Sequence, residues 1–213
     1  MELDTLMAEG MRLSKPCIHL RAGDGASEVQ GIWGGQGVLE VPHKSDWVHR
    51  VSVACSALQL LGFELEGCLS IYESAGGCIA EIDSTAGLPH SSPSGLVLLG
   101  SPMMSFPPLD AVCLYGNSEI EEWLKSEGLS RNDASDLDGT ELGDAYQREY
   151  QARSPLYVEN ADVVLGGWHM IWPEDDAYDE NKGSLLLWTF RDAEPWIEVW
   201  LNDGRLDVKE RIT

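Results

Sequence analysis

The sequence predicts an α+β fold with a mixed or largely antiparallel sheet, two central helices and a C-terminal antiparallel β-hairpin. Three observations lead to this prediction. Short apolar runs separated by turn residues fill the first half, two helical patterns follow residue 117, and a strand–turn–strand pattern ends the chain. A length of 213 residues fits a single α+β domain, 1–213, with a possible subdivision into a strand-rich part, 1–117, and a part with helices and C-terminal strands, 118–213.

The first half contains seven segments with the composition of β-strands. Glycine pairs and a run rich in Pro, Ser and Gly separate these segments, and such residues favour turns. The segment 51–61 fits a strand at its start and a helix equally well. The seven predicted strands are residues 17–21, 29–33, 47–53, 68–72, 78–82, 96–99 and 111–115.

Two helices are predicted after these strands. The first begins at Ser118, because Ser118 and Glu121 have the spacing of a capping box, and it ends at Gly128. The second covers residues 138–153, where apolar and aromatic side chains recur at helical spacing. Acidic residues crowd the start of this second helix, where the helix dipole favours anions.

Strand patterns return at the end of the chain. The sequence Asn202-Asp203-Gly204 between the last two segments supplies the positive φ that a tight hairpin turn needs. Alternation along 196–201 places two tryptophans and Glu198 on one face and three aliphatic side chains on the other. The predicted strands are residues 163–172, 185–190, 196–201 and 205–212.

The chain carries 36 acidic and 14 basic side chains, a net charge of −22. Affinity for a nucleic-acid backbone or for an anionic membrane comes from Lys and Arg, so this charge argues against both as direct partners. We expect instead a basic protein partner, such as a toxin, an effector or a nuclease. The sequence has no stretch of about 18 apolar residues and its start is acidic, which predicts neither a transmembrane helix nor a secretory signal.

Five cysteines are spread along the chain and none forms a C-x-x-C pair. An odd, widely spaced set predicts reduced, mostly buried thiols in a cytoplasmic protein rather than a disulfide framework. No spacing selects a catalytic Cys–His pair. For Cys55 and Cys113, which lie in apolar surroundings, an inert core thiol is the favoured interpretation.

Motifs for nucleotide binding or nucleophilic catalysis are absent from the sequence. It has no G-x-S-x-G elbow, and the glycine-rich segment 31–37 lacks the G-x-G-x-x-G order. His43 and His49 fit no standard metal spacing. His169 with the carboxylates of residues 174–176 could hold a divalent cation or form an acid–base pair. A solvated acidic loop is the plainer interpretation there, so we predict no catalytic residue, no metal and no cofactor.

A tryptophan-rich C-terminal region suggests a second kind of enzyme. Glycoside hydrolysis uses two carboxyl groups, and Asp192, Glu194 and Glu198 lie near Trp196 among other tryptophans. Alternating tryptophans on neighbouring strands are more often a packed sheet face, which is the interpretation that we favour.

The acidic excess is densest in two blocks, residues 133–144 and 174–180. Like charges repel one another in the folded state, so such blocks carry a cost unless something offsets them. Aromatic side chains within or beside the blocks could anchor a partner that the charges attract. The predicted partner-binding residues are Asp133, Asp136, Asp138, Glu141, Asp144, Tyr146, Tyr150, Trp172, Glu174, Asp175, Asp176, Tyr178 and Asp179.

In its overall profile, as a small acidic α+β protein without a catalytic signature, the chain resembles immunity proteins that neutralise bacterial toxins. This resemblance implies a non-enzymatic protein-binding module that covers the active site of a basic toxin or effector. Two alternatives stay open. One is a DNA mimic that inhibits a nucleic-acid-binding protein, which requires carboxylates in rows at phosphate-like spacing. The other is a hydrolase that uses Asp or Glu with a tryptophan-rich pocket, or a metal site centred on His169.

Overall fold

The computed structural model describes residues 1–23, 29–35, 46–88, 95–131, 134–153, 162–168, 183–189 and 196–211. The chain divides into two compact units, and each is built from segments that are distant in sequence. The helical unit comprises Met1–Pro16, Met104–Asn160 and Gly167–Asn181, and the sheet unit comprises Cys17–Met103, Ala161–Gly166 and Lys182–Thr213. The subdivision that the sequence suggested at residue 117 falls inside the helical unit. None of the described helices is long and apolar enough to cross a membrane.

Ten strands in the described residues form one sheet, in the order β10-β9-β8-β7-β1-β6-β2-β3-β4-β5. Neighbouring strands are antiparallel, as in the pairs β1–β7, β2–β3, β4–β5 and β9–β10. The strands are β1 (Lys15–Ala22), β2 (Val29–Trp33), β3 (Val48–Ala54), β4 (Cys68–Ser74), β5 (Gly77–Asp83), β6 (Leu96–Ser105), β7 (Val163–Gly166), β8 (Ser184–Thr189), β9 (Trp196–Asn202) and β10 (Arg205–Arg211).

The fold class predicted from the sequence is therefore wrong. The protein is largely β, with one antiparallel sheet and several short helices, and is not an α+β fold with two central helices and an added C-terminal hairpin. The strands before and after the helices are not separate parts, because β1 pairs directly with β7, with Ile18 opposite Leu165. This pairing joins the strands that precede the helices to those that follow them in one sheet, and no local sequence pattern predicts it.

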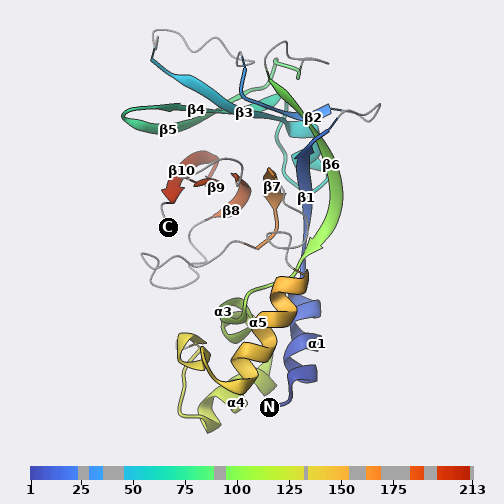
Figure 1. The fold of residues 1–213 in the computed structure, drawn as a ribbon, viewed down its shortest axis with the longest axis vertical. Coiled ribbons are helices and arrows are strands. Elements are labelled where there is room, and N and C mark those ends of the chain that lie inside the picture. Colours follow the sequence, from blue (N-terminus) through green and yellow to red (C-terminus); the bar gives the residue numbers. More distant parts are fainter. Residues whose placement is uncertain are drawn as a thin grey trace. The chain divides into compact units, whose positions relative to one another are not determined.

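The sheet nearly closes on itself, because its two edge strands lie next to each other (Figure 1). The backbone N–H of Cys78 in β5 donates a hydrogen bond of 2.6 Å to Oε1 of Glu210 in β10. In the described residues, no ladder of backbone hydrogen bonds joins β5 to β10, and the two strands are at opposite ends of the strand order.

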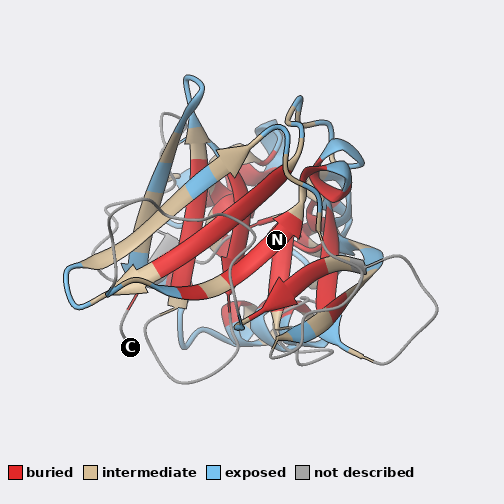
Figure 2. Ribbon diagram, turned by 90° about the horizontal axis from the view of Figure 1, so that it is seen from above, coloured by how far each residue is buried: buried red, intermediate tan, exposed pale blue. Residues whose placement is uncertain are grey.

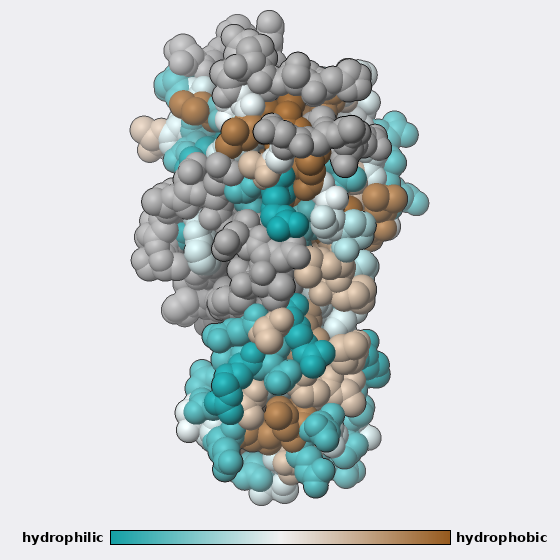
Figure 3. All heavy atoms as spheres, turned by 45° about the vertical axis from the view of Figure 1, so that its right-hand side comes forward, coloured by the Kyte–Doolittle hydropathy of each residue, from teal (hydrophilic) through white to brown (hydrophobic). Residues whose placement is uncertain are grey.

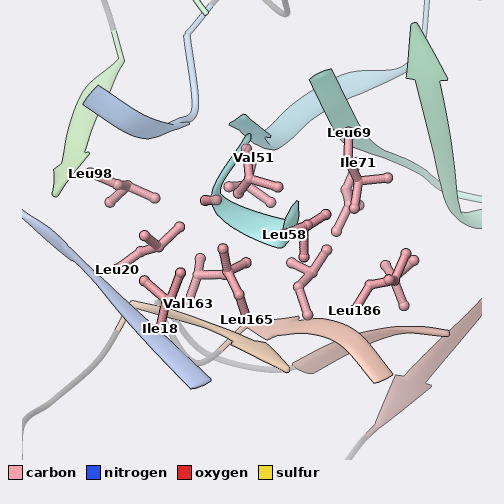
Figure 4. Close-up of a cluster of buried hydrophobic side chains, with 14 of the residues drawn as sticks. Ile18, Leu20, Val51, Leu58, Leu69, Ile71, Leu98, Val163, Leu165 and Leu186 are labelled. Atoms are coloured by element: carbon pink, nitrogen blue, oxygen red, sulfur yellow. The ribbon is translucent and has the colours of Figure 1, made fainter. Parts of the chain in front are cut away.

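A hydrophobic core fills the space that the curved sheet encloses. Aliphatic side chains from strands on opposite sides of the sheet point toward one another, together with Leu58 of the short helix α2 (Cys55–Gln59) (Figure 4). Buried residues run along the central strands, whereas the turns between strands are exposed (Figure 2). The core residues that Figure 4 labels are Ile18, Leu20, Val51, Leu58, Leu69, Ile71, Leu98, Val163, Leu165 and Leu186.

The C-terminal hairpin confirms its sequence prediction. Asp203 and Gly204 have φ values of 47° and 75°, which is the positive-φ pair that a tight two-residue turn requires. Alternation along β9 also holds: Ile197 and Val199 belong to the enclosed core, and Glu198 lies on the opposite face.

The helical unit contains α1 (Leu3–Leu13), α3 (Leu109–Tyr115), α4 (Ser118–Ser126), the 3₁₀ turn η1 (Ala134–Leu137) and α5 (Glu141–Arg153). Figure 1 shows α1, α3, α4 and α5 grouped around one core. Its centre includes Leu6, Val112, Ile120 and Tyr146. Burial of these apolar faces stabilises helices that are individually too short to form alone.

Three local predictions in the helical unit need correction. Residues 111–115 belong to α3 rather than to a strand, and α1 was not predicted at all. The cap of α4 is Asn117, whose side-chain oxygen accepts hydrogen bonds from the N–H groups of Glu119 and Ile120, and not Ser118. Asn is as good an N-cap as Ser. The sequence therefore predicted a capped helix start correctly but placed the cap one residue too late.

Candidate docking surface

The acidic residues of the first block surround the start of α5. Thr140 fixes the chain there: its Oγ1 accepts a hydrogen bond of 3.0 Å from Gly143 N–H and donates one of 2.7 Å to the carbonyl of Leu137. These two bonds join the end of η1 to the first turn of α5. Carboxylates are favoured at this position, because the unpaired N–H groups of a helix start carry partial positive charge.

Four carboxylates around this start form what we call the acidic face: Asp136, Asp138, Glu141 and Asp144. All four residues are exposed, and none forms an ion pair with any residue in the described part of the chain. Arg148 lies one turn after Asp144 on α5 and forms no ion pair with it either. On the side of the helical unit that Figure 3 shows, hydrophilic residues surround an apolar area.

Other carboxylates of the same unit are neutralised by neighbouring cations. The carboxylate of Glu121 binds both a lysine and an arginine, and two further pairs follow the helical spacing of three or four residues. The pairs and their N–O distances are Arg12–Glu9, 2.7 Å; Lys125–Glu121, 2.6 Å; Arg131–Glu121, 3.0 Å; and Arg153–Glu149, 3.2 Å. The acidic face is thus an uncompensated region in a unit whose cations are largely committed elsewhere.

Asp110, in the first turn of α3, adds a half-buried carboxyl group beside the acidic face. Burial raises the pKa of Asp110, and the neighbouring charge of Asp138 raises this pKa further, against a backbone hydrogen bond that lowers it. The negative charge of Asp138 thus adds to the effect of burial in disfavouring the ionised form of Asp110. A nearby cation would offset this charge.

The two tyrosines that the sequence assigned to this surface are not exposed. Tyr146 is 0% exposed and Tyr150 is 3% exposed, and both belong to the core of the helical unit. The hydroxyl of Tyr146 donates a hydrogen bond of 2.9 Å to the carbonyl of Pro107, and its ring stacks on Phe106. These rings pack α5 against the core of the helical unit. The described part of the predicted surface therefore offers carboxylates and no aromatic anchor.

The remaining predicted partner-binding residues fall on parts of the chain that the structure does not describe. They include the whole second acidic block and its aromatic neighbours. These residues are Asp133, Trp172, Glu174, Asp175, Asp176, Tyr178 and Asp179. His169, on which the alternative metal site depends, also lies outside the described residues.

The tryptophan-rich hydrolase site is not supported by the described residues. Trp188 and Trp200 are 2% and 3% exposed, so neither offers a platform to a sugar. The carboxylate of Glu198 is 1% exposed and pairs with Arg211. Among the described residues, no three His, Cys, Asp or Glu side chains are arranged to hold a metal ion.

A buried polar network in the sheet unit escaped the sequence analysis. His49 and Ser52 of β3 and Ser70 of β4 are linked by hydrogen bonds, although each residue is 6% exposed or less. A nucleophile–base pair has similar distances, but these hydroxyl groups are 0% exposed, so a substrate does not reach them in this structure. The network is a structural feature of the sheet.

The five cysteines confirm the sequence prediction of reduced, mostly buried thiols. All are free, and Cys17, Cys55, Cys68 and Cys113 are buried while Cys78 is half-buried. Burial raises the pKa of Cys55 to about 11 and that of Cys113 to about 12, so both thiols stay protonated and unreactive at neutral pH.

A pocket of about 360 Å³ lies beside α4, between Leu124, Lys125, Leu129 and Arg131. Its cations are already engaged, because Lys125 and Arg131 both bind Glu121. Arg131 also donates to the carbonyls of Cys113, Leu114 and Gly116 and thereby satisfies the end of α3. Through these contacts Arg131 connects the end of α3 to Glu121 of α4.

Comparison of the sequence with protein-family models found no matching family, and a search of curated proteins found no match.

Proposed function

We propose that the protein is a non-enzymatic protein-binding module of the immunity or inhibitor type, which docks a basic toxin or effector and covers its active site. The observation that carries this proposal is the acidic face, four exposed carboxylates without a cation partner among the described residues. Free, buried thiols support a reducing compartment such as the cytoplasm, where such a module would meet its partner.

Electrostatics explains why an uncompensated surface favours binding. Clustered carboxylates raise the energy of the folded chain through mutual repulsion, and a basic partner removes this cost when it docks. The same field steers the partner during diffusion, so the association rate is high at low salt and falls as salt screens the charges. Arginine is the best match, because its planar guanidinium binds a carboxylate through two hydrogen bonds.

The test is to neutralise the acidic face and measure binding. A variant with D136N, D138N, E141Q and D144N removes four charges and keeps the shape of each side chain. A control variant removes the same number of charges from exposed positions of the same helical unit. The control substitutions are D4N, E119Q, E122Q and E127Q.

Partners are captured from extracts of the native host, identified, purified and titrated against the three proteins at about 50 and 200 mM salt. We expect a basic partner whose association rate falls roughly tenfold or more with the acidic-face variant and much less with the control. Equal binding by both variants, or an affinity that does not depend on salt, would remove the proposal. If the partner binds nucleic acid, and this nucleic acid competes with the protein for the same site on the partner, the result would instead support the DNA-mimic alternative.

A further inference from the structure

Helix α1 carries a stripe of apolar side chains that the rest of the helical unit leaves partly uncovered. Leu3, Met7 and Met11 are spaced four residues apart, so they lie on one face of the helix, one turn after another. Leu3 and Met7 pack against the core of the unit but are only partly buried, and Met11 is 59% exposed. We call these three residues the α1 stripe.

Helix α5 continues this apolar surface. The two helices α1 and α5 lie side by side in the helical unit (Figure 1). Leu142, in the first turn of α5, packs against the same core as Leu3 and Met7 and is likewise only partly buried. Figure 3, in which the α1 side of the unit comes forward, shows an apolar area that hydrophilic residues surround. An exposed apolar area with a polar rim is typical of a site that binds another protein.

The acidic face borders this apolar surface. Glu141 of the acidic face is the residue next to Leu142, and it lies one turn before Ala145, which is partly buried. An occupant of the apolar surface therefore meets carboxylates at its border. The two features form one composite surface, with apolar side chains on α1 and α5 and uncompensated carboxylates beside them.

Electrostatics selects the kind of occupant that this composite surface fits. A second copy of the chain would bring another net charge of −22, and an anionic lipid surface would be repelled in the same way. A neutral apolar ligand would cover the α1 stripe but would leave the carboxylates without counter-ions. A partner segment with both apolar and cationic side chains satisfies both parts of the surface.

The spacing of the α1 stripe selects the form of that segment. A helix face presents no row of unpaired backbone groups, so an extended segment would gain no ladder of hydrogen bonds here. Side chains four residues apart form a ridge, and such a ridge fits the groove of another helix. Methionine side chains are flexible and polarisable, so they adapt to the apolar face of a helix that docks on them.

We propose that the α1 stripe and Leu142 bind a basic amphipathic helix of the partner. Its apolar face covers the stripe, and its Lys and Arg side chains pair with the carboxylates of the acidic face. This inference rests on the proposed function and specifies which part of a basic partner docks. It also supplies the apolar anchor that the buried tyrosines of α5 do not provide.

Two synthetic peptides test the proposal directly. Each has about 14 residues, or roughly four helical turns, and consists of Leu and Lys only. In the first peptide the leucines recur at spacings of three and four residues, which places them on one face of a helix. In the second peptide the same residues are reordered so that no helix face is apolar. Because composition and charge are equal, a difference in binding reports the apolar face alone.

The protein variants remove either the apolar or the charged part of the surface. M7Q/M11Q makes the stripe polar and keeps the length and helix propensity of both side chains. L60Q, at a residue of the sheet unit that is 70% exposed, is the matched control. The four-substitution variant of the acidic face removes the charge. Circular dichroism and thermal denaturation check that each variant is folded.

Titration calorimetry at about 50 and 200 mM salt measures the affinity of each peptide for each protein. We expect M7Q/M11Q to bind the amphipathic peptide about tenfold or more weakly, because buried methionine side chains contribute at least that much, and L60Q to bind it like the wild type. The reordered peptide should bind more weakly than the amphipathic one, and equally to the wild type and M7Q/M11Q.

NMR of isotope-labelled methionine methyl groups locates the contact in the wild-type protein, without any substitution. The signals of Met7 and Met11, assigned from the spectra of the single variants M7Q and M11Q, should shift with the amphipathic peptide and not with the reordered one. Equal affinity of the wild type for the two peptides, or methyl signals of both residues that stay in place, would overturn the helix-binding surface.

The variant of the acidic face separates this failure from a failure of the proposed function. If it binds both peptides more weakly while M7Q/M11Q binds them like the wild type, the acidic face attracts cations but the α1 stripe binds no helix, and only the present inference falls. If the variant of the acidic face binds both peptides as tightly as the wild type, the carboxylates do not attract a basic partner, and the proposed function falls as well.

Discussion

The Nε2 atom of His49 lies 2.8 Å from Oγ of Ser52, and its Nδ1 atom lies 2.8 Å from the carbonyl oxygen of Gly34. A carbonyl only accepts, so Nδ1 carries a proton, and in the neutral imidazole Nε2 accepts the hydroxyl proton of Ser52. The chain continues from Ser52 to Ser70, whose Oγ atoms are 2.6 Å apart. His49 is buried, and burial favours the neutral imidazole over the charged one.

This preference for the neutral imidazole makes stability depend on pH. Burial lowers the pKa of His49 below its usual 6.5, while the hydrogen bonds to backbone groups act in the opposite direction. The pKa of His49 is lower in the folded protein than in the unfolded chain. Below about pH 6.5 the folded protein therefore binds fewer protons at this residue than the unfolded chain does. The contribution of His49 is thus present above that pH and is lost as the pH falls through the folded-state value.

We predict that the free energy of unfolding of the wild type falls more steeply between about pH 7 and pH 5 than that of H49Q. Urea denaturation at several pH values measures both. The carboxylates titrate in both proteins, so the difference between the two curves isolates the histidine. Parallel curves would show that His49 does not set this dependence.

Asp110 gives a prediction of opposite sign. Its raised pKa means that the charged form is disfavoured in the folded protein, chiefly by burial and then by Asp138. The ionised group therefore destabilises the protein at neutral pH, and this cost disappears as the pH falls below the folded-state value. We expect D110N and D138N each to raise the free energy of unfolding at neutral pH by about 0.5–1 kcal/mol.

D136N is the matched control for this comparison. Asp136 is exposed, and no effect of its charge contributes to the shift of Asp110. Thermal denaturation at low and high salt distinguishes the cases, because added salt should reduce the gain from D138N, which is a surface charge effect. A gain from D136N as large as that from D138N would mean that net charge, rather than this pair, limits stability.

Local signals explain which parts of the fold the sequence could predict. The β9–β10 hairpin was predictable because Asp203 and Gly204 specify the turn themselves. Helix α3 was not, because residues 111–115 form a short apolar run that fits a buried strand and a buried helix equally. Helix α1 was missed because its cap position, Glu2, makes no capping hydrogen bond and so carries no start signal.

Pairing between distant segments explains the other errors. The β1–β7 ladder and the near-closure of the sheet depend on contacts that no local pattern encodes. The His49–Ser52 hydrogen bond depends on a register shift between His49 and Val51, which brings residues three apart onto one face. The four-residue spacing of Tyr146 and Tyr150 placed both rings on one helix face but could not show that this face is the core.

Close packing of α1 against Phe106 leads to a third prediction. A Cβ atom at Gly10 would lie 2.4 Å from the Phe106 ring and 2.9 Å from the Tyr146 hydroxyl. Both rings are buried, so a shift of either ring would disturb the packing around it. We expect G10A to lower the free energy of unfolding by about 1–3 kcal/mol, although alanine favours a helix more than glycine does.

Denaturant unfolding of G10A measures this loss. A8G, at an exposed position of the same helix, removes helix propensity without touching the core and should cost about 1 kcal/mol. A double variant, G10A with F106L, should recover part of the loss, because the smaller side chain makes room. A stability gain in G10A alone would show that α1 does not pack this closely.

The buried pair of Glu198 and Arg211 gives the last prediction. Arg211 donates from Nε and Nη2 to one oxygen of Glu198, both at 3.1 Å, and Trp200 Nε1 donates to the same oxygen at 3.2 Å. The two charged side chains are 1% and 4% exposed. Removing either partner leaves a buried charge without its counter-ion, so E198Q and R211M should each cost about 3–5 kcal/mol.

The double variant E198Q/R211M should be much more stable than the sum of the two losses allows, because no charge is then left buried alone. Urea denaturation of the wild type and the three variants completes the cycle. Additive losses would mean that the two side chains act independently despite their contact. A coupling of several kcal/mol would show that the pair joins β9 to the end of β10.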